Sequence, residues 1–277
     1  MARDGERMLQ QAASAGMARG FFLNGALRPI IRHYVHPKVV GLENLAGHKG
    51  PLILAANHSS HMDTPLVLNS LPKDLRRKTL VAAASDYFFS SRVLGLFVSV
   101  AIGAVPMDRR SVSKQTMDRV ESLLAQGWCL VMYPEGSRTL DGRLYRGKTG
   151  IARLALTTGV PVVPVGLVGT YHAMPAGRSW PVYGQVEVRF GKPLTFERYT
   201  LGVPNQLVLR AITDQIMYEI MALTGQTYVD EYVTRAKARL SRGHAQLEAV
   251  PENGAEPAEP AEPAQDTDLD ARDASSG

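Results

Sequence analysis

The order of hydrophobic and polar positions divides the chain into a helical start, an alternating middle part and a polar end. From residue 6 to residue 35, apolar residues recur at helical spacing between arginines, and Pro29 interrupts the run. We predict a pair of amphipathic helices here, which either packs on the protein core or lies at a lipid interface with its arginines among the headgroups. After residue 240 apolar positions become few, and Glu-Pro-Ala repeats three times at 256–264, which is typical of a disordered tail.

Strand-like and helix-like patterns alternate between residues 36 and 200. Short apolar runs predict strands at 38–41, 52–56, 80–84, 130–133, 162–168 and 186–190. Longer patterns predict helices at 64–71, 90–98, 111–126 and 148–158, followed by two closing helices at 204–223 and 229–240. This alternation predicts an α/β fold with a central, mostly parallel sheet flanked by helices. We therefore expect an N-terminal amphipathic helical segment at a membrane interface (1–35), one α/β domain (36–240) and a disordered, acidic, Pro/Ala-rich tail (241–277).

Charge is distributed unevenly along the chain. Residues 241–277 contain two arginines and nine Asp or Glu, whereas residues 1–240 contain 29 basic and 17 acidic side chains. A basic body favours an anionic partner such as lipid headgroups, phosphate groups, an acidic carrier protein or nucleic acid. No run reaches the ~18–20 apolar residues that span a bilayer, so we expect the chain to lie on a membrane rather than cross it. The single cysteine, Cys129, stands in an apolar run and is interpreted as a core residue.

Two of the predicted strands end in loops with chemically active side chains. The run 51–56 leads to His58 and Asp63, and the run 130–133 leads to Glu135 and Arg138. In open α/β sheets, ligands bind at the carboxyl ends of the strands. We therefore expect the two loops to face one crevice.

His58 and Asp63 are five positions apart across a predicted strand-to-helix turn. A carboxylate on one ring nitrogen fixes the tautomer and stabilises the imidazolium, so the other nitrogen can take a proton. The chain has no G-x-S-x-G motif that would supply a nucleophile, and we infer that the nucleophile is a hydroxyl of the substrate. The alternative is that Asp63 only caps the next helix and that His58 is an ordinary loop residue.

The loop at 135–138 has side chains that suit an anion. Gly136 allows the backbone to approach closely, Ser137 offers a hydroxyl, and Arg138 offers a planar fork of donors. Arg109 and Lys148 add positive charge on either side of this loop in the sequence. The alternative is a solvated loop with surface ion pairs.

Four ordered blocks of this sequence resemble the 1-acylglycerol-3-phosphate O-acyltransferase family. They are Asn57-His58-x4-Asp63, Gly-Ala-Val-Pro-Met-Asp-Arg (103–109), Tyr-Pro-Glu-Gly-Ser-Arg-Thr (133–139) and Val-Pro-Val-Val-Pro-Val (160–165). The second block departs from the family pattern, because Pro106 and Met107 replace the more typical apolar pair. The resemblance implies that His58 is the general base and Asp63 its partner. It implies that Arg109 and Arg138 bind the acceptor phosphate, with Lys148 as a weaker contact. Glu135 and Gly136 would shape the acceptor site, and Pro164 would lie by the pocket wall; Ser137, with its hydroxyl, is a further candidate for substrate binding.

The resemblance also implies a reaction and its partners. A fatty acyl group would pass from acyl-CoA or acyl-carrier protein to the free hydroxyl of 1-acylglycerol-3-phosphate (lysophosphatidic acid), without a metal or another cofactor. The expected partners are the lysophospholipid acceptor, the acyl donor and an anionic membrane surface, and nucleic acid is not among them. The expected location is the cytoplasmic face of a membrane, as a peripheral or monotopic protein.

Three other functions are compatible with parts of the pattern. The first is an acyltransferase that acts on another lysophospholipid or on a glycolipid. The second is a lipid-binding protein of the same fold without activity, although the intact pair of His58 and Asp63 argues against it. The third is a metallohydrolase that uses His58, His61 and Asp63 as ligands, for which the sequence offers no further well-placed ligands.

Overall fold

The structure is a computed structural model that describes residues 23, 25, 28–48, 50–84, 103–107, 114–175, 178, 180–199 and 205–248. The chain divides into two compact units, Met1–Arg239 and Leu240–Gly277. The predicted helix at 90–98, most of the N-terminal segment and Arg109 lie outside the described residues.

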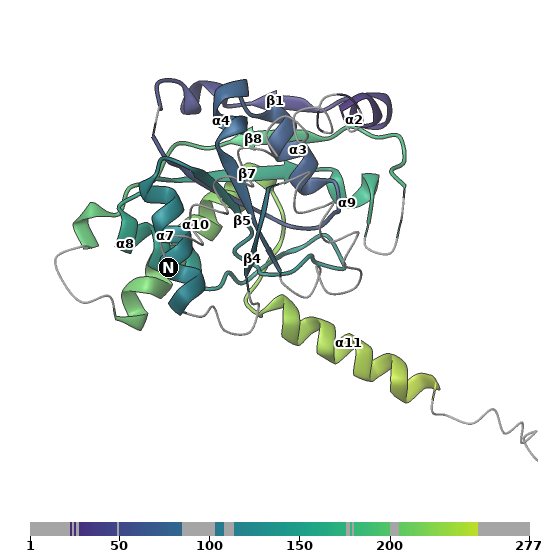
Figure 1. The fold of residues 1–277 in the computed structure, drawn as a ribbon. Coiled ribbons are helices and arrows are strands. Elements are labelled where there is room, and N and C mark those ends of the chain that lie inside the picture. Colours follow the sequence, from purple (N-terminus) through teal and green to yellow (C-terminus); the bar gives the residue numbers. More distant parts are fainter. Residues whose placement is uncertain are drawn as a thin grey trace, which may run out of the picture. The chain divides into compact units, whose positions relative to one another are not determined.

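The centre of the first unit is a seven-stranded sheet in the order β1-β8-β7-β2-β5-β3-β4 (Figure 1). Neighbouring strands are parallel, except that β7 and β8 are antiparallel. This confirms the predicted fold class. The strands of the sheet are β1 (Lys38–Val40), β2 (Ile53–Ala56), β3 (Thr79–Ala84), β4 (Ala104–Met107), β5 (Cys129–Met132), β7 (Val162–Val168) and β8 (Glu187–Phe190).

A second, two-stranded parallel sheet pairs β6 (Leu144–Tyr145) with β9 (Tyr228–Val229). Helical segments precede, connect and follow the strands. They are α2 (Arg28–Tyr34), η2 (Leu42–Leu45), α3 (Asp63–Ser70), α4 (Lys73–Arg77), α7 (Lys114–Ala125), α8 (Gly150–Thr158), α9 (Thr170–Ala173), η3 (Glu197–Tyr199), α10 (Gln206–Thr224) and α11 (Val233–Glu248).

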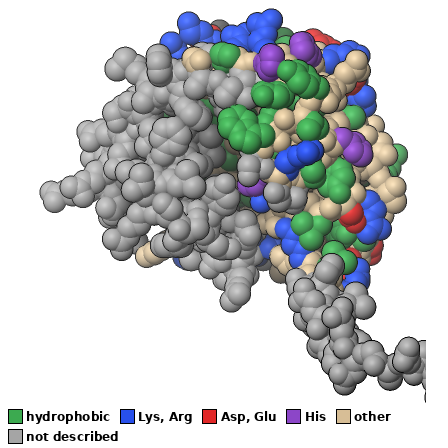
Figure 2. Space-filling model, turned by 90° about the vertical axis from the view of Figure 1, so that its right-hand side faces the viewer, with side chains coloured by type: hydrophobic (Ala, Val, Ile, Leu, Met, Phe, Trp, Pro, Cys, Tyr) green, Lys and Arg blue, Asp and Glu red, His purple; other side chains and the backbone are tan. Residues whose placement is uncertain are grey.

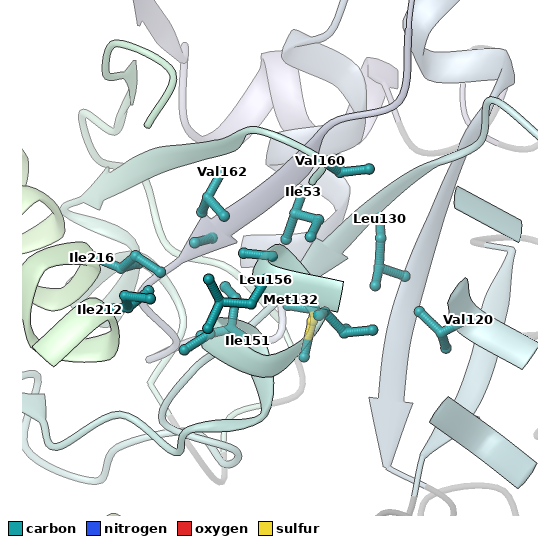
Figure 3. Packing of buried hydrophobic residues seen from close by; sticks show 14 of the residues in the cluster. Ile53, Val120, Leu130, Met132, Ile151, Leu156, Val160, Val162, Ile212 and Ile216 are labelled. Atoms are coloured by element: carbon teal, nitrogen blue, oxygen red, sulfur yellow. The ribbon is translucent and has the colours of Figure 1, made fainter. Parts of the chain in front are cut away.

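Alternating side chains of the central strands point to two separate cores. Ile53 and Ala55 of β2 belong to one buried cluster together with side chains of α7, α8 and α10 (Figure 3). Leu54 and Ala56 belong to the opposite cluster, which includes side chains of α2 and α3. Both faces of β2 are therefore covered, which explains why its sequence is continuously apolar. Cys129 is buried at the start of β5, as its apolar surroundings predicted.

The edge strand β4 was not predicted. It pairs with β3 through Ala83 and Pro106, and in the described part of the sheet it has a neighbour on one side only. Proline lacks a backbone N–H and is tolerated at sheet edges, so the unusual second sequence block forms a strand after all.

The described part of the N-terminal segment packs on the core. Pro29 occupies the first turn of α2, where proline does not disturb a helix. Ile31 and Val35 are buried in the second cluster, while Arg28 and Arg32 are exposed. One side of α2 therefore packs on the core, while its arginines face outward. Among the described residues, no helix has the length and apolar character needed to cross a bilayer.

The C-terminal boundary needs a correction. The closing helix was predicted to end at residue 240, but α11 continues to Glu248. Residues 241–248 include Ala, Gln, Leu and Glu, which are good helix formers, so the acidic tail begins later than predicted. Residues 249–277 lie outside the described part of the chain.

Candidate active site

His58 and Asp63 lie at the carboxyl end of β2 and are in direct contact. Asp63 is fully buried, and its Oδ2 lies 2.8 Å from His58 Nδ1. The same oxygen accepts hydrogen bonds from the backbone N–H groups of Ser59 at 2.7 Å and Ser60 at 2.8 Å. Because a carboxylate only accepts, the His58 Nδ1–H donates, and Nε2 is the ring nitrogen that would take a proton.

The alternative role of Asp63 as a helix cap does not describe its contacts. Asp63 is the first residue of α3, the N-cap residue is Met62, and no side chain caps this helix end. The carboxylate turns back toward the preceding loop instead. The loop of five residues is thus folded around one carboxylate oxygen, and this holds the imidazole in place.

Tyr133 forms one wall beside the imidazole. Its ring stacks on His58 with centroids 3.9 Å apart and an interplanar angle of 17°. Its hydroxyl lies 2.7 Å from Thr64 Oγ1, on the helix that starts with Asp63. Burial raises the pKa of Tyr133, so this phenol remains protonated. Tyr133 thus keeps the His58 ring from turning out of the plane that the carboxylate sets.

Glu135 joins the loop after β5 to the loop after β2. It is fully buried; Oε1 accepts from the His58 backbone N–H at 2.8 Å, and Oε2 accepts from the Tyr145 N–H at 3.0 Å. Burial raises the pKa of Glu135 to about 8, although the two N–H groups oppose this shift. The described contacts give Glu135 a positioning role, since both oxygens bind the protein's own backbone.

Gly136 and Lys148 meet at the start of the anion-suited loop. Gly136 has φ +76°, a conformation that favours glycine, and a Cβ atom here would lie 3.0–3.2 Å from the end of the Lys148 side chain. The Lys148 backbone N–H donates to Pro134 O at 2.8 Å. The Lys148 side chain therefore lies directly over Gly136. It places a cation next to the loop that follows β5 and contains Glu135.

Ser137 and Arg138 follow in the same loop. The next residue, Thr139, donates its backbone N–H to His58 O at 2.9 Å, which fixes this loop against the histidine. Ser137 is 7% exposed and Arg138 is partly buried. Arg138 also lies close enough to His61 to affect it, because burial first, then Arg138 and His58, lower the pKa of His61. A histidine–carboxylate pair thus lies beside a loop that carries two cations.

Residues 36–168 match the family model described as Acyltransferase. This part of the chain is therefore similar to the acyltransferase family. The similar proteins include chloroplastic 1-acyl-sn-glycerol-3-phosphate acyltransferases of Brassica napus, 34% identical over 166 residues, and of Arabidopsis thaliana, 34% identical over 159 residues. Each alignment covers 56% of this chain but only 44% and 43% of the respective relative, so the matched region spans less than half the length of these proteins.

The chain also has the fold of a solved structure. The crystal structure of the 1-acyl-sn-glycerophosphate (LPA) acyltransferase PlsC from Thermotoga maritima matches with a TM-score of 0.52 and 22% sequence identity. The match covers 87% of this chain and 80% of that chain. At this identity the comparison shows a shared fold, which agrees with the mostly parallel sheet.

Of the residues predicted for the site, the structure brings together those of the first and third blocks and Lys148, which follows the third block. They are His58, Asp63, Glu135, Gly136, Ser137, Arg138 and Lys148. Arg109 lies outside the described residues, two positions after the end of β4. Within the described ranges, no group of three His, Cys, Asp or Glu side chains is arranged so that it could hold a metal ion.

The sequence did not indicate two supporting residues of this site. Asn57 is buried at the end of β2, where its side chain accepts from Leu167 N–H at 2.7 Å and donates to Leu167 O at 2.9 Å on β7. It also donates to Gln226 Oε1 at 3.0 Å. Gln226 in turn donates to Gly142 O at 2.6 Å. Asn57 stands next to His58 in the first block, which was the one signal for its role.

Proposed function

We propose that this protein transfers a fatty acyl group from a thioester donor to the free hydroxyl of 1-acylglycerol-3-phosphate, which gives phosphatidic acid. The observation that carries the proposal is the 2.8 Å contact between His58 and a buried Asp63, next to a loop with Arg138 and Lys148. A base and an anion site side by side suit an acceptor with a hydroxyl near a phosphate. The similar proteins from Brassica napus and Arabidopsis thaliana are named as 1-acyl-sn-glycerol-3-phosphate acyltransferases, which supports the same acceptor.

In the proposed reaction, His58 Nε2 removes the proton of the acceptor hydroxyl. The oxygen attacks the thioester carbonyl, the new C–O bond forms, and the C–S bond breaks when the tetrahedral intermediate collapses. His58 returns its proton to the leaving thiolate. Asp63 stabilises the imidazolium while His58 carries the proton. The donor, acyl-CoA or acyl-carrier protein, is a substrate, and we propose that the reaction needs neither a metal nor a covalent acyl-enzyme.

The acceptor phosphate would bind at the loop of residues 135–138. Arg138 offers two parallel donors and Lys148 a point charge, and both are suited to phosphate oxygens. The Ser137 hydroxyl offers a further donor. Arg109 is proposed as an additional phosphate contact from the second block.

We further propose that the protein works as a peripheral or monotopic protein at the cytoplasmic face of a membrane. Each acyl CH₂ moved from lipid into water costs about 0.8 kcal/mol, so an enzyme at the interface avoids a large cost. Trp180 and Tyr183 are 64% and 67% exposed, and Tyr183 OH lies 2.7 Å from His33 Nε2 of α2, whose Arg28 and Arg32 are exposed. Figure 2 shows hydrophobic, histidine and basic side chains side by side on one face.

A panel of acceptors and donors tests the proposed reaction. Purified protein is assayed with lysophosphatidic acid, other lysophospholipids, a glycolipid and monoacylglycerol, each with acyl-CoA and with acyl-carrier protein. His58→Ala should lower kcat by about 10²- to 10⁴-fold, the usual contribution of a general base. Near-wild-type turnover of His58→Ala would refute the mechanism, and a strong preference for another acceptor would correct the substrate.

Arg138 variants test the phosphate site in the same assay. Arg138→Ala should raise KM for lysophosphatidic acid by about 10- to 150-fold, the contribution of a hydrogen bond to a charged group. Arg138→Lys should have a smaller effect, because it keeps the charge but loses the fork. Residual transfer to monoacylglycerol, which has no phosphate, should remain nearly unchanged. Equal losses on both acceptors would show that Arg138 supports the fold or the transition state instead.

A further inference from the structure

Lys237 reaches the anion-suited loop from a distant part of the chain. It lies on α11, within the first unit, and its Nζ donates to Ser137 Oγ at 2.8 Å. The two residues are 100 positions apart. Lys237 also lies well beyond residues 36–168, which match the family model. The contact therefore adds a cation to the loop from a region that the family match does not include.

The first turns of α11 hold Lys237 in this position. Val233 and Ala236 are buried in a small cluster with Tyr145. Tyr145 belongs to β6, which pairs with β9 just before α11, and its N–H is bound by Glu135. The helix is thus attached to the same strand and loop that support the site. Lys237 follows the buried Ala236 in the sequence, so this packing places its side chain next to Ser137.

The polarity of the contact determines what Ser137 can do. An ammonium group has three donors and no acceptor, so Ser137 Oγ must accept from Lys237. The serine proton then points elsewhere and can be donated to an anion. The ammonium also adds positive charge within a few ångströms of that hydroxyl. Together with Arg138 and Lys148, the loop gains a third cation close to the place where the acceptor phosphate would bind.

We infer that Lys237 is a specificity-determining residue, which orients the Ser137 hydroxyl and adds positive charge for the phosphate group of the acceptor. The inference rests on the proposed function, because it assigns Lys237 to the same acceptor site. Lys237 acts mainly through Ser137 and is therefore a positioning residue. Loss of Lys237 weakens the binding of acceptors that carry a phosphate and leaves the binding of acceptors without a phosphate unchanged.

Binding and kinetics of Lys237→Met test the inference. The dissociation constant of a short-chain lysophosphatidic acid is measured without an acyl donor, and KM and kcat are measured with a donor. Lys237→Met should raise Kd and KM by about 2- to 10-fold, the range for one lost hydrogen bond, with kcat and melting temperature little changed. Values for monoacylglycerol should stay the same. Lys237→Arg, which keeps a charged donor, should recover most of the affinity.

The matched control is Arg235→Met. Arg235 is an exposed basic residue on the same helix, so this variant loses the same charge without the contact to Ser137, and it should bind like the wild type. The double variant Ser137→Ala with Lys237→Met should lose less affinity than the product of the two single losses, because the two residues act together.

Three results would overturn the inference: an unchanged Kd in Lys237→Met, an equal loss on monoacylglycerol, or an equal loss in Arg235→Met. Failure of the proposed function has a different outcome. Wild-type protein that binds lysophosphatidic acid but does not acylate it would refute the proposed reaction, while a Kd raised only in Lys237→Met would still support the role of Lys237. Absence of any binding by the wild type would refute both.

Discussion

Replacement of Asp63 by asparagine removes one charge from the site and changes little else. Oδ2 accepts all three of the carboxylate's hydrogen bonds, from His58 Nδ1 and from the N–H groups of Ser59 and Ser60. An amide oxygen can accept the same three. The other oxygen, Oδ1, is buried and has no hydrogen-bond partner among the described residues, so the amide NH₂ can take its place without facing another donor. The variant should therefore fold and keep the His58 ring in its present tautomer.

The cost of Asp63→Asn should appear when His58 becomes charged. The negative charge of a nearby carboxylate stabilises the imidazolium, and the loss of such a charge contact costs roughly 1.4–4 kcal/mol. Asp63 lies at 2.8 Å and is fully buried, so solvent screens this interaction little. In the proposed mechanism the imidazolium forms only when His58 takes the proton of the acceptor. We therefore expect kcat to fall by about 10- to 10³-fold while KM for the acceptor changes little.

Initial rates over a range of acceptor concentrations measure both parameters, and thermal unfolding reports on the fold. Asp214→Asn is the matched control. It makes the same chemical change at a half-exposed carboxylate that pairs with Arg210 on α10, and it should leave kcat unchanged. An Asp63→Asn protein with kcat within about twofold of the wild type, at an unchanged melting temperature, would refute the assignment of His58 as a base supported by this carboxylate.

Two further predictions concern the loop after β5. Gly136→Ala should lower the free energy of unfolding by about 1–2 kcal/mol, because alanine is strained at this positive φ. It should also raise KM for lysophosphatidic acid, because the new Cβ atom displaces Lys148. The control is Gly127→Ala, at φ +84° with nothing within 4 Å, which should show the backbone strain without the change in KM. The pKa of Glu135 rises from 4.5 to about 8 on folding, so the folded state holds a proton that the unfolded state releases. The contribution of Glu135 to the free energy of unfolding should therefore fall as the pH rises from 4.5 to 8, by up to about 1.4 kcal/mol per pH unit. Urea unfolding of wild type and Glu135→Gln across this window should show a pH-dependent difference, and parallel curves would contradict it.

The sheet could be predicted where its strands are long, apolar and buried. The runs at 52–56, 130–133 and 162–168 became β2, β5 and β7, because both faces of these strands contact helices or loops and need apolar residues. Periodicity gave no sign of β6 and β9, because each has two residues and a pattern needs more positions. β4 was missed for another reason. It contains Pro106, and proline argues against a strand except at the edge of a sheet, where β4 lies.

The site could be predicted only as far as its contacts are local or follow strand ends. The contact of His58 with Asp63 spans five residues, and the meeting of two loops follows from the parallel order of β2 and β5. The other contacts connect positions that no motif relates. Asn57 and Gln226 are 169 residues apart, and Ser137 and Lys237 are 100 residues apart. Such pairs form only in the tertiary fold, and no characteristic spacing in the sequence indicates them.

The supporting contacts hold His58 in position from two sides. On one side, Asn57 ties the end of β2 to β7 through both backbone groups of Leu167. On the other side, Glu135 ties the backbone of His58 to β6. His58 is thus fixed by side chains that bind the protein's own backbone or one another, while Arg138 and Lys148 lie beside it. Since a displacement of about 1 Å can lower the rate by roughly 10²-fold, substitutions at Asn57 should reduce kcat although this residue is buried behind the base.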